Sequence, residues 1–395
     1  MENLFKQNNR PVGRIVRLLS DEERAVRKKS FQVVAVAAVF LLGFIATLGF
    51  IKRQTAVKEQ PVISLEKKAN YVLTEIAGLA KVDPGRAMGL AADLNKSISD
   101  SQKDISDKKM LNRLNALLQK LDSLQSELGL ARKIKLTEFL DPKLLRDGLN
   151  AEILSGNAEK LLIFDPRKNI LATVSPVDRS GQIIGGGIEG INSFALGRNS
   201  AFGIKDSRIV EFPFSGGETL EAVKDDGAWS GDSIVSWFGG NLYVIDKSGS
   251  EILKYPALEN TSGKSEFGSR RRWFKPGINY DLSDIVGAEV DGDIWILHQD
   301  GRISRFRNGS KITYKQVLAD FMSEPVLFSV PLEGDKIWVL SRKEKKVVVL
   351  NKETGEFAGE WETEEFGKAQ GLAVNEKLGK MFVLVEGKIY VANTQ

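Results

Sequence analysis

The segment DIWILHQDGRISRFR, residues 293–307, decides the fold, because five other segments of the chain repeat its pattern. Each copy has an apolar run, a turn rich in Asp, Gly, Ser or Lys, and a second run rich in β-forming residues. This order is typical of a β-hairpin. The other copies are KLLIFDPRKNILATV (160–174), SAFGIKDSRIVEFPF (200–214), NLYVIDKSGSEILKY (241–255), KIWVLSRKEKKVVVL (336–350) and KMFVLVEGKIYVAN (380–393).

The spacing of the copies predicts a ring of blades. They start 40 to 52 residues apart, which is the period of propeller repeats. Strand-like runs such as IVSWFGG from Ile234 and IVGAEVDG from Ile285 precede the hairpins and would supply a further strand to each blade. We therefore expect a mainly β chain with a six-bladed β-propeller over residues 133–395. One position near the start of each copy is apolar or aromatic: Leu162, Phe202, Tyr243, Trp295, Trp338 and Phe382.

The last repeat lacks an outer strand, since the chain stops at Gln395 soon after the sixth hairpin. An open blade exposes unpaired backbone groups, which proteins usually cover. The best donor is KIKLTEFL, Lys133–Leu140, with Ile134 and Leu136 as apolar closure residues. We expect this segment to close the ring and to join the end of the preceding helical region to the last blade.

A membrane anchor is predicted near the N-terminus. Residues 31–51, FQVVAVAAVFLLGFIATLGFI, carry no charge and are long enough for one helical crossing. The excess of Lys and Arg before this run places residues 1–30 in the cytoplasm as a basic segment and the propeller outside it, in a single-pass cell-membrane protein. A cleaved signal peptide or a buried core helix is the alternative. The length, the following Lys52 and Arg53, and the lack of a polar face favour the uncleaved anchor.

A helical stalk is expected over residues 64–132, after a linker at residues 52–63. Apolar positions fall on one helical face from Leu65 to Ala80, and Asp83–Pro84 suits the cap and first position of a second helix. A third helix is expected over about residues 106–128. These helices form either a small bundle or a coiled coil that makes a homodimer. The broken heptad pattern favours the bundle.

Composition excludes several classes of function. The chain has no cysteine and one histidine, so thiolate chemistry is excluded and sites built on several histidines have only one candidate residue. Lys and Arg are outnumbered by Asp and Glu in residues 133–395, which argues against a nucleic-acid partner. We expect no cofactor and no enzymatic activity.

Three motifs in the propeller resemble functional sites but have simpler explanations. GGGIEG at Gly185–Gly190 fits a dinucleotide fingerprint, yet the residues that follow are strand-like rather than helical, which favours an inter-blade loop. His298 aligns with a hairpin turn and is expected to be exposed. The acidic pairs Asp225–Asp226 and Asp291/Asp293 lack the spacing of a calcium loop, and turn chemistry explains them.

The densest basic and aromatic cluster of the propeller is Arg270, Arg271, Arg272, Trp273 and Phe274. Guanidinium groups bind carboxylates and phosphates through paired hydrogen bonds. The cluster is thus a candidate docking loop for a protein or an anionic ligand. The alternative is an ordinary solvated loop.

The repeats resemble the six-bladed propellers of the NHL and gluconolactonase-like superfamily. The segments NLYVIDKSGSEILKYP, DLSDIVGAEVDGDIWILHQDGRISRF and KKVVVLNKETGEF resemble more closely the membrane-anchored bacterial propellers attached to, or encoded alongside, metal-dependent serine/threonine phosphatases of the 2C type. The resemblance covers roughly residues 60–395. It implies a propeller that acts beside a signalling phosphatase. Fused members carry the phosphatase before the membrane helix, where this chain has only about thirty residues.

Two functions follow from these observations. The first is a ligand- or protein-binding sensor or scaffold, held at the membrane. The alternative is a metal-dependent, lactonase-like hydrolase, because the gluconolactonase-like enzymes hold a metal in the channel with acidic and amide side chains. The sequence does not place such a ligand set in this chain.

Overall fold

A computed structural model describes residues 59–186, 189–224, 227, 229, 232–258, 265–314, 322 and 324–394. The chain divides into two units, residues 1–67 and 68–395. The basic segment 1–30, the membrane helix predicted at 31–51 and most of the linker lie outside the described residues. Within the part of the chain that is described, no helix is both long and apolar enough to cross a membrane.

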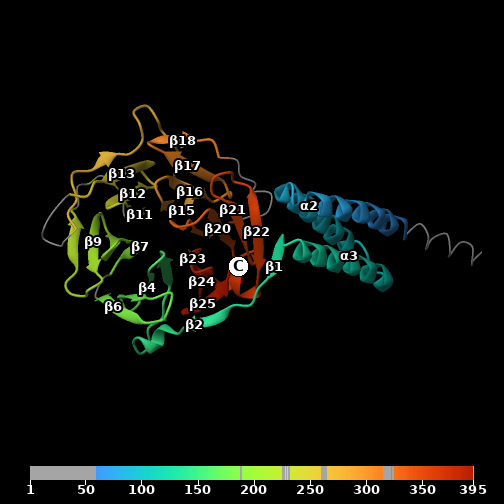
Figure 1. Ribbon diagram of the computed structural model, residues 1–395, viewed down its shortest axis with the longest axis horizontal. Coiled ribbons are helices and arrows are strands. Elements are labelled where there is room, and N and C mark those ends of the chain that lie inside the picture. Colours follow the sequence, from blue (N-terminus) through green and yellow to red (C-terminus); the bar gives the residue numbers. More distant parts are fainter. Residues whose placement is uncertain are drawn as a thin grey trace, which may run out of the picture. The chain divides into compact units, whose positions relative to one another are not determined.

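Six sheets, antiparallel apart from one added parallel strand, form the six-bladed propeller that the repeats predict (Figure 1). The first blade contains β3 (Ile153–Gly156), β4 (Leu161–Asp165), β5 (Ile170–Val174) and β6 (Gly181–Gly186). The second contains β7 (Ile191–Leu196), β8 (Ser200–Lys205), β9 (Arg208–Pro213) and β10 (Leu220–Val223). The third contains β11 (Ser233–Phe238), β12 (Asn241–Asp246), β13 (Glu251–Tyr255) and β14 (Arg271–Arg272).

The remaining blades complete the ring. The fourth contains β15 (Ile285–Val290), β16 (Ile294–His298), β17 (Ile303–Arg307) and β18 (Ser310–Ile312). The fifth contains β19 (Leu327–Ser329), β20 (Lys336–Ser341), β21 (Lys346–Asn351) and β22 (Phe357–Glu362). A 3₁₀ turn, η2 (Glu364–Lys368), leads to the sixth, with β23 (Ala369–Asn375), β24 (Lys380–Val385) and β25 (Lys388–Asn393).

The second strand of each blade forms because its apolar run can be buried on both faces. Every residue of β4 and of β16 is buried, which explains why these runs are continuously apolar rather than alternating. The aromatic position of the repeat is a core position, since Trp295 and Trp338 are at most 1% exposed. Removing one such side chain costs about 3–5 kcal/mol of folding free energy.

A strand from before the first blade completes the last one. β2 (Thr137–Leu140) pairs antiparallel with β25, which confirms that the sixth blade takes its outer strand from residues 133–140. The predicted single strand is, however, divided. β1 (Ala131–Lys133) instead pairs parallel with β22 as a fifth strand of the fifth blade.

Ile134 and Leu136, named as closure residues, lie in the connection between β1 and β2. The backbone N–H of Ile134 donates to the carbonyl of Glu362. Leu136 is 5% exposed and belongs to the apolar cluster shared by the fifth and sixth blades. Their contribution to ring stability stays a prediction. A short 3₁₀ turn, η1 (Pro142–Leu144), follows β2 and leads into the first blade.

The first and last blades meet at a close backbone contact. A Cβ atom added at Gly371 would lie 2.6 Å from the Leu154 Cβ, and one at Gly156 would lie 2.7 Å from the Ala373 Cβ. An apolar cluster from both blades and β2, including Phe139 and Phe382, lies beside this contact. The ring therefore closes through close apolar packing.

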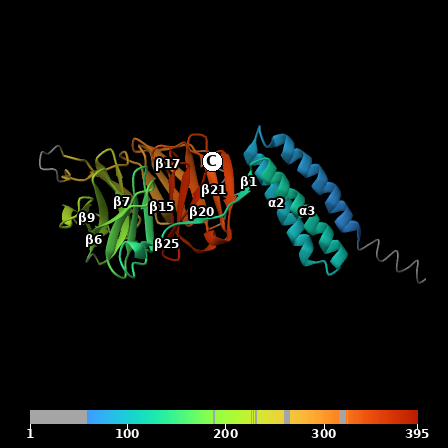
Figure 2. The same cartoon turned by 60° about the horizontal axis from the view of Figure 1, so that its bottom comes forward.

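The stalk is a set of packed helices. Residues 59–79 are helical, and α2 (Pro84–Lys103) and α3 (Lys108–Glu127) lie side by side (Figure 2). The predicted start of the second helix is confirmed, because the Asp83 side chain caps it by accepting from the backbone N–H of Arg86. The buried positions of α2 and α3 are Ala87, Met88, Ala91, Leu94, Ile98, Met110, Leu114, Leu117 and Leu121.

Candidate functional site

A cavity of about 410 Å³ runs along the middle of the ring. Its wall is made by the first strand of every blade and the residues that follow it, because these strands are the innermost ones. The described wall includes three glutamates, Glu289, Glu333 and Glu376, and no lysine, arginine or histidine. It also includes serine hydroxyls and the aromatic residues Trp237, Phe238 and Phe328. We call this cavity the central channel.

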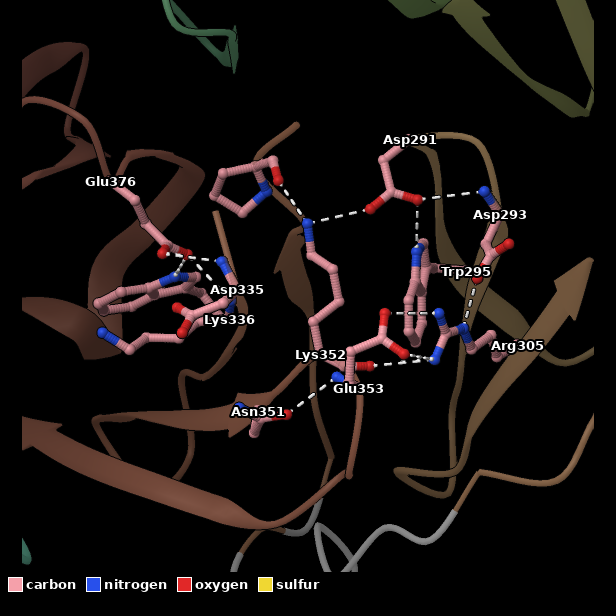
Figure 3. Close-up of polar contacts among 12 residues, drawn as sticks. Asp291, Asp293, Trp295, Arg305, Asp335, Lys336, Asn351, Lys352, Glu353 and Glu376 are labelled. Carbon is pink, nitrogen blue, oxygen red and sulfur yellow. Dashed lines mark hydrogen bonds and ion pairs between the residues drawn. The ribbon is translucent and has the colours of Figure 1, made fainter. Parts of the chain in front are cut away.

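Two of the three channel glutamates already have partners. Glu376 accepts hydrogen bonds from the Trp338 indole N–H at 3.1 Å and from the backbone N–H groups of Asp335 and Lys336 at 3.2 Å each (Figure 3). Glu333 forms an ion pair of 3.4 Å with Lys377. These two carboxylates are therefore compensated within the protein.

Glu289 differs, because its carboxyl has no hydrogen-bond or ion-pair partner among the described residues. It lies on β15, the inner strand of the fourth blade. Burial raises the pKa of Glu289 to about 8, and the negative charge of Asp291 raises this pKa further while Lys352 opposes the shift. The Glu289 carboxyl consequently holds its proton to higher pH than an ordinary glutamate does.

A pair of buried charges lies where the fourth and fifth blades meet, and Figure 3 shows its surroundings. The Lys352 ammonium lies 3.0 Å from Asp291 Oδ2 and donates to the Pro331 carbonyl at 2.5 Å. The other carboxylate oxygen of Asp291 accepts from the Trp295 indole N–H at 2.8 Å. Asp291, assigned to turn chemistry by its sequence context, therefore also joins two blades.

A second ion-paired group adjoins the first. The Arg305 side chain is 6% exposed and donates to Asp293 Oδ2 at 2.5 Å and to Glu353 at 2.9 and 3.1 Å. Its guanidinium also lies over the Trp295 ring, 4.6 Å from the centroid. Burial alone would raise the pKa of Asp293, but hydrogen bonds from Arg307 and Arg305 outweigh it and lower that pKa.

The two groups together form an ion-paired cluster whose charges balance. Its carboxylates are Asp291, Asp293 and Glu353, and its cations are Lys352, Arg305 and Arg307. Each carboxylate of the cluster is paired with a cation of the cluster. No cation of the cluster is therefore left over to pair with Glu289. The sequence did not reveal this cluster, because its members come from two repeats and their pairing depends on the ring.

His298 is buried, and the expectation of an exposed turn residue was wrong. It is 1% exposed at the end of β16. Its Nδ1 lies 2.6 Å from Asp284 Oδ1, its Nε2 lies 3.1 Å from Ser304 Oγ, and Ser304 contacts the Tyr280 hydroxyl at 2.5 Å. The turn begins only at Gln299, so His298 keeps its place in the strand.

The repeat register held a signal for this burial. The residues equivalent to His298 in other blades, Asp165, Asp246 and Ser341, are also polar and at most 4% exposed. Asp165, for example, accepts from the backbone N–H groups of Arg167 and Lys168 in the turn that follows. A buried polar residue at this position therefore organises the turn between the second and third strands.

The cluster from Arg270 to Phe274 does not form one exposed patch. Phe274 is 3% exposed inside an apolar cluster, with Trp273 packed beside it. Arg272 is ion-paired with Glu251 at 2.5 Å and donates to Ile278 and Asn279. Arg270 and Arg271 are exposed. Docking of an anionic partner at the segment from Arg270 to Phe274 stays a prediction.

One other sequence motif has a clear position, whereas the acidic pair Asp225–Asp226 lies outside the described residues. Gly185 and Gly186 end β6, and the segment after Gly190 is the strand β7 rather than a helix, so the context that a dinucleotide fingerprint requires is missing. Among the described residues, no three His, Cys, Asp or Glu side chains are grouped so that they could hold a metal ion.

Comparisons with known proteins show likeness of fold only. No family model and no curated protein matches the chain. A chain in the crystal structure of a nidogen/laminin complex is 12% identical, with a TM-score of 0.41 over 54% of this chain and 80% of that one. A protein of unknown function from Bacteroides thetaiotaomicron is 9% identical, with a TM-score of 0.44 over 66% and 72%.

A third similar structure is that of PorZ, described as a surface component of the type-IX secretion system of Porphyromonas gingivalis. It is 11% identical, with a TM-score of 0.37 over 62% of this chain and 37% of that one. The molecule is a six-bladed β-propeller by its own strand pairing.

Proposed function

We propose that this protein is a binding module whose central channel takes a small ligand or the tip of a partner chain. The observation that carries the proposal is the 410 Å³ channel, which combines hydroxyl groups, aromatic rings and the carboxyl of Glu289. Binding sites commonly combine apolar walls with a few convergent polar groups. Ser236 supports the proposal, because it lines the channel, is 7% exposed and has a hydroxyl with no hydrogen-bond partner among the described residues.

The ring is suited to binding because it holds its inner strands rigidly. Adjacent blades share buried apolar clusters, as between the second and third blades and between the third and fourth. A wall fixed in this way loses little conformational entropy when a ligand enters. The channel is thus organised before binding.

The experiment uses Trp237, which lies in the channel wall. The protein is labelled with 5-fluorotryptophan, and the Trp237 resonance is assigned by comparison with Trp237→Phe. Amines, sugars, amino acids and organic acids are then added in turn. We expect at least one class to shift the Trp237 resonance and to leave that of Trp361, on β22, unchanged. If no class shifts it, the channel-binding function is overturned.

We further propose that the N-terminal segment tethers this module to the cell membrane, with the propeller outside the cytoplasm and a signalling phosphatase as its partner. The support is the apolar run at residues 31–51, its flanking charges and the resemblance of the repeats. Tags at Met1 and Gln395, probed with protease on intact cells, test the tether. Accessibility of the Met1 tag together with protection of the Gln395 tag would reverse the orientation.

A further inference from the structure

Glu289 is a half-buried carboxyl that faces the central channel and has no partner among the described residues. Acids that are partly withdrawn from water normally have a hydrogen-bond donor or a cation, because a carboxylate loses hydration there. Glu289 has neither among the described residues, and it lines the channel. The ion-paired cluster beside it uses its three cations on its own three carboxylates.

The strands that pack on either side of β15 do not compensate Glu289. These strands are β11 and β19, and both belong to the channel wall. β11 reads SIVSWF and β19 reads LFS, so neither carries a charged residue. The charged groups that act on Glu289 are Asp291, on the turn after its own strand, and Lys352, which is already paired with Asp291.

The other wall groups suit a positively charged guest. Aromatic rings attract cations through their negative faces, and Trp237, Phe238 and Phe328 all line the channel. The described wall has no basic side chain that would repel a cation. A ligand ammonium would thus supply the positive counter-charge that the Glu289 carboxylate lacks, and it would lie beside aromatic surfaces.

We propose that the central channel binds a small organic cation, such as a primary amine, whose charged group pairs with the Glu289 carboxylate. The inference rests on the proposed function, since it names the ligand class of the same channel. On binding, the amine keeps its proton as ammonium, and Glu289 releases its proton to solvent. The ligand and Glu289 then form a neutral pair in the channel.

The experiment compares matched ligands that differ in charge. Benzylammonium, benzyl alcohol and benzoate are titrated into the purified protein by calorimetry at pH 6, 7 and 8. We expect benzylammonium to bind at least about tenfold more tightly than benzyl alcohol at pH 8. Below pH 8 its affinity should fall about tenfold per pH unit, because Glu289 must lose a proton that it holds with a pKa of about 8. Titrations in buffers of different ionisation enthalpy should show proton release.

Variants distinguish this pairing from a general effect. Glu289→Gln keeps the shape of the side chain and should remove both the preference for the cation and the pH dependence. Glu324→Gln, at a surface glutamate paired with Lys343, is the matched control and should bind as the parent protein does. Thermal melting of both variants checks that they fold.

The outcomes separate the two proposals. Benzyl alcohol or benzoate binding as tightly as benzylammonium overturns the cation inference and leaves channel binding standing. Full cation affinity in Glu289→Gln also overturns it. If none of the three ligands binds, the cation inference falls, and the Trp237 screen decides whether the channel binds another class.

Discussion

Two places where blades meet show opposite solutions to the same packing problem. The sixth and first blades meet through apolar side chains and two glycines, with Gly371 against Leu154 and Gly156 against Ala373. The fourth and fifth blades meet through ion pairs: Lys352 and Asp291 are both largely buried, and the buried Arg305 pairs with the exposed Glu353.

The difference shows that the apolar contact stabilises the ring, whereas the ion pairs set the electrostatic environment of the channel. Apolar packing stabilises at little cost, whereas buried ion pairs seldom add net stability, because desolvation offsets their attraction. Charges are therefore not needed to join two blades. Their placement beside Glu289 gives the channel an electrostatic character that the apolar contact cannot provide.

The largest effect is expected where the ring closes. Replacing residues 131–140 by a Gly/Ser linker of equal length removes β1 and β2 together with the buried side chains of Leu136, Phe139 and Leu140. Each buried Leu or Phe contributes about 2–5 kcal/mol, so we expect a loss of more than about 5 kcal/mol in the free energy of unfolding. The exposed edge of β25 should also promote aggregation.

Thermal melting and light scattering measure this effect. Leu144→Ala is the control, because Leu144 lies just after the segment and is 80% exposed. A linker variant that melts and remains soluble like Leu144→Ala would show that β1 and β2 are dispensable for closure.

A smaller loss is expected from the ion-paired cluster. Arg305→Ala leaves Asp293 buried with only Arg307 as its cation and removes the cation above Trp295. Breaking a buried pair on one side costs about 3–5 kcal/mol. Arg307→Ala removes a half-exposed arginine from the same carboxylate and should cost much less. Urea unfolding of both variants measures the contrast, and equal losses would contradict the different burial of the two arginines.

The smallest effect is a pH dependence of stability. The pKa of Glu289 is about 8 in the folded protein, against an ordinary value of 4.5. Between these values the folded state holds a proton that the unfolded state has released, so stability falls as pH rises through this window. Glu289→Gln should remove that fall and be more stable than the parent above pH 8, on the order of 2 kcal/mol after allowance for channel water.

Urea unfolding at pH 5, 7 and 9 tests this sign. Glu360→Gln is an informative comparison, because burial also raises the pKa of Glu360, to about 7, and its contribution has the same direction. Parallel stability curves for Glu289→Gln and the parent would contradict a raised pKa of the Glu289 carboxyl.

The blades could be predicted from the sequence because their pattern is local and repeated. A buried second strand requires a continuous apolar run, and such a run is visible in all six copies. The donor region for the last blade was also visible, since a missing outer strand implies a donor. The parallel pairing of β1 with β22 was not visible, because three residues, ARK, carry no strand signal of their own.

The candidate site was not predictable in the same way. Lys352 and Asp291 are ordinary turn residues and Arg305 is an ordinary strand residue in their own repeats, and only the ring brings them together. The arginine cluster was visible as composition, but β14 and the packing around it distribute its side chains between solvent and core. His298 was misplaced because its position in the repeat was taken as part of the turn, whereas it is the last residue of the strand β16.

The donation of β2 to the last blade has a consequence for how the chain is made. Lys388 on β25 and Glu138 on β2 form an ion pair across 250 positions of sequence. At about 5–20 residues per second, the ribosome needs roughly 12–50 s to deliver the partner strand after β2 has emerged. During that time β2 is an unpaired edge strand on a growing chain. Because the ring closes with its last strand, the segment TEFL must avoid pairing with incorrect strands while the rest of the chain is synthesised.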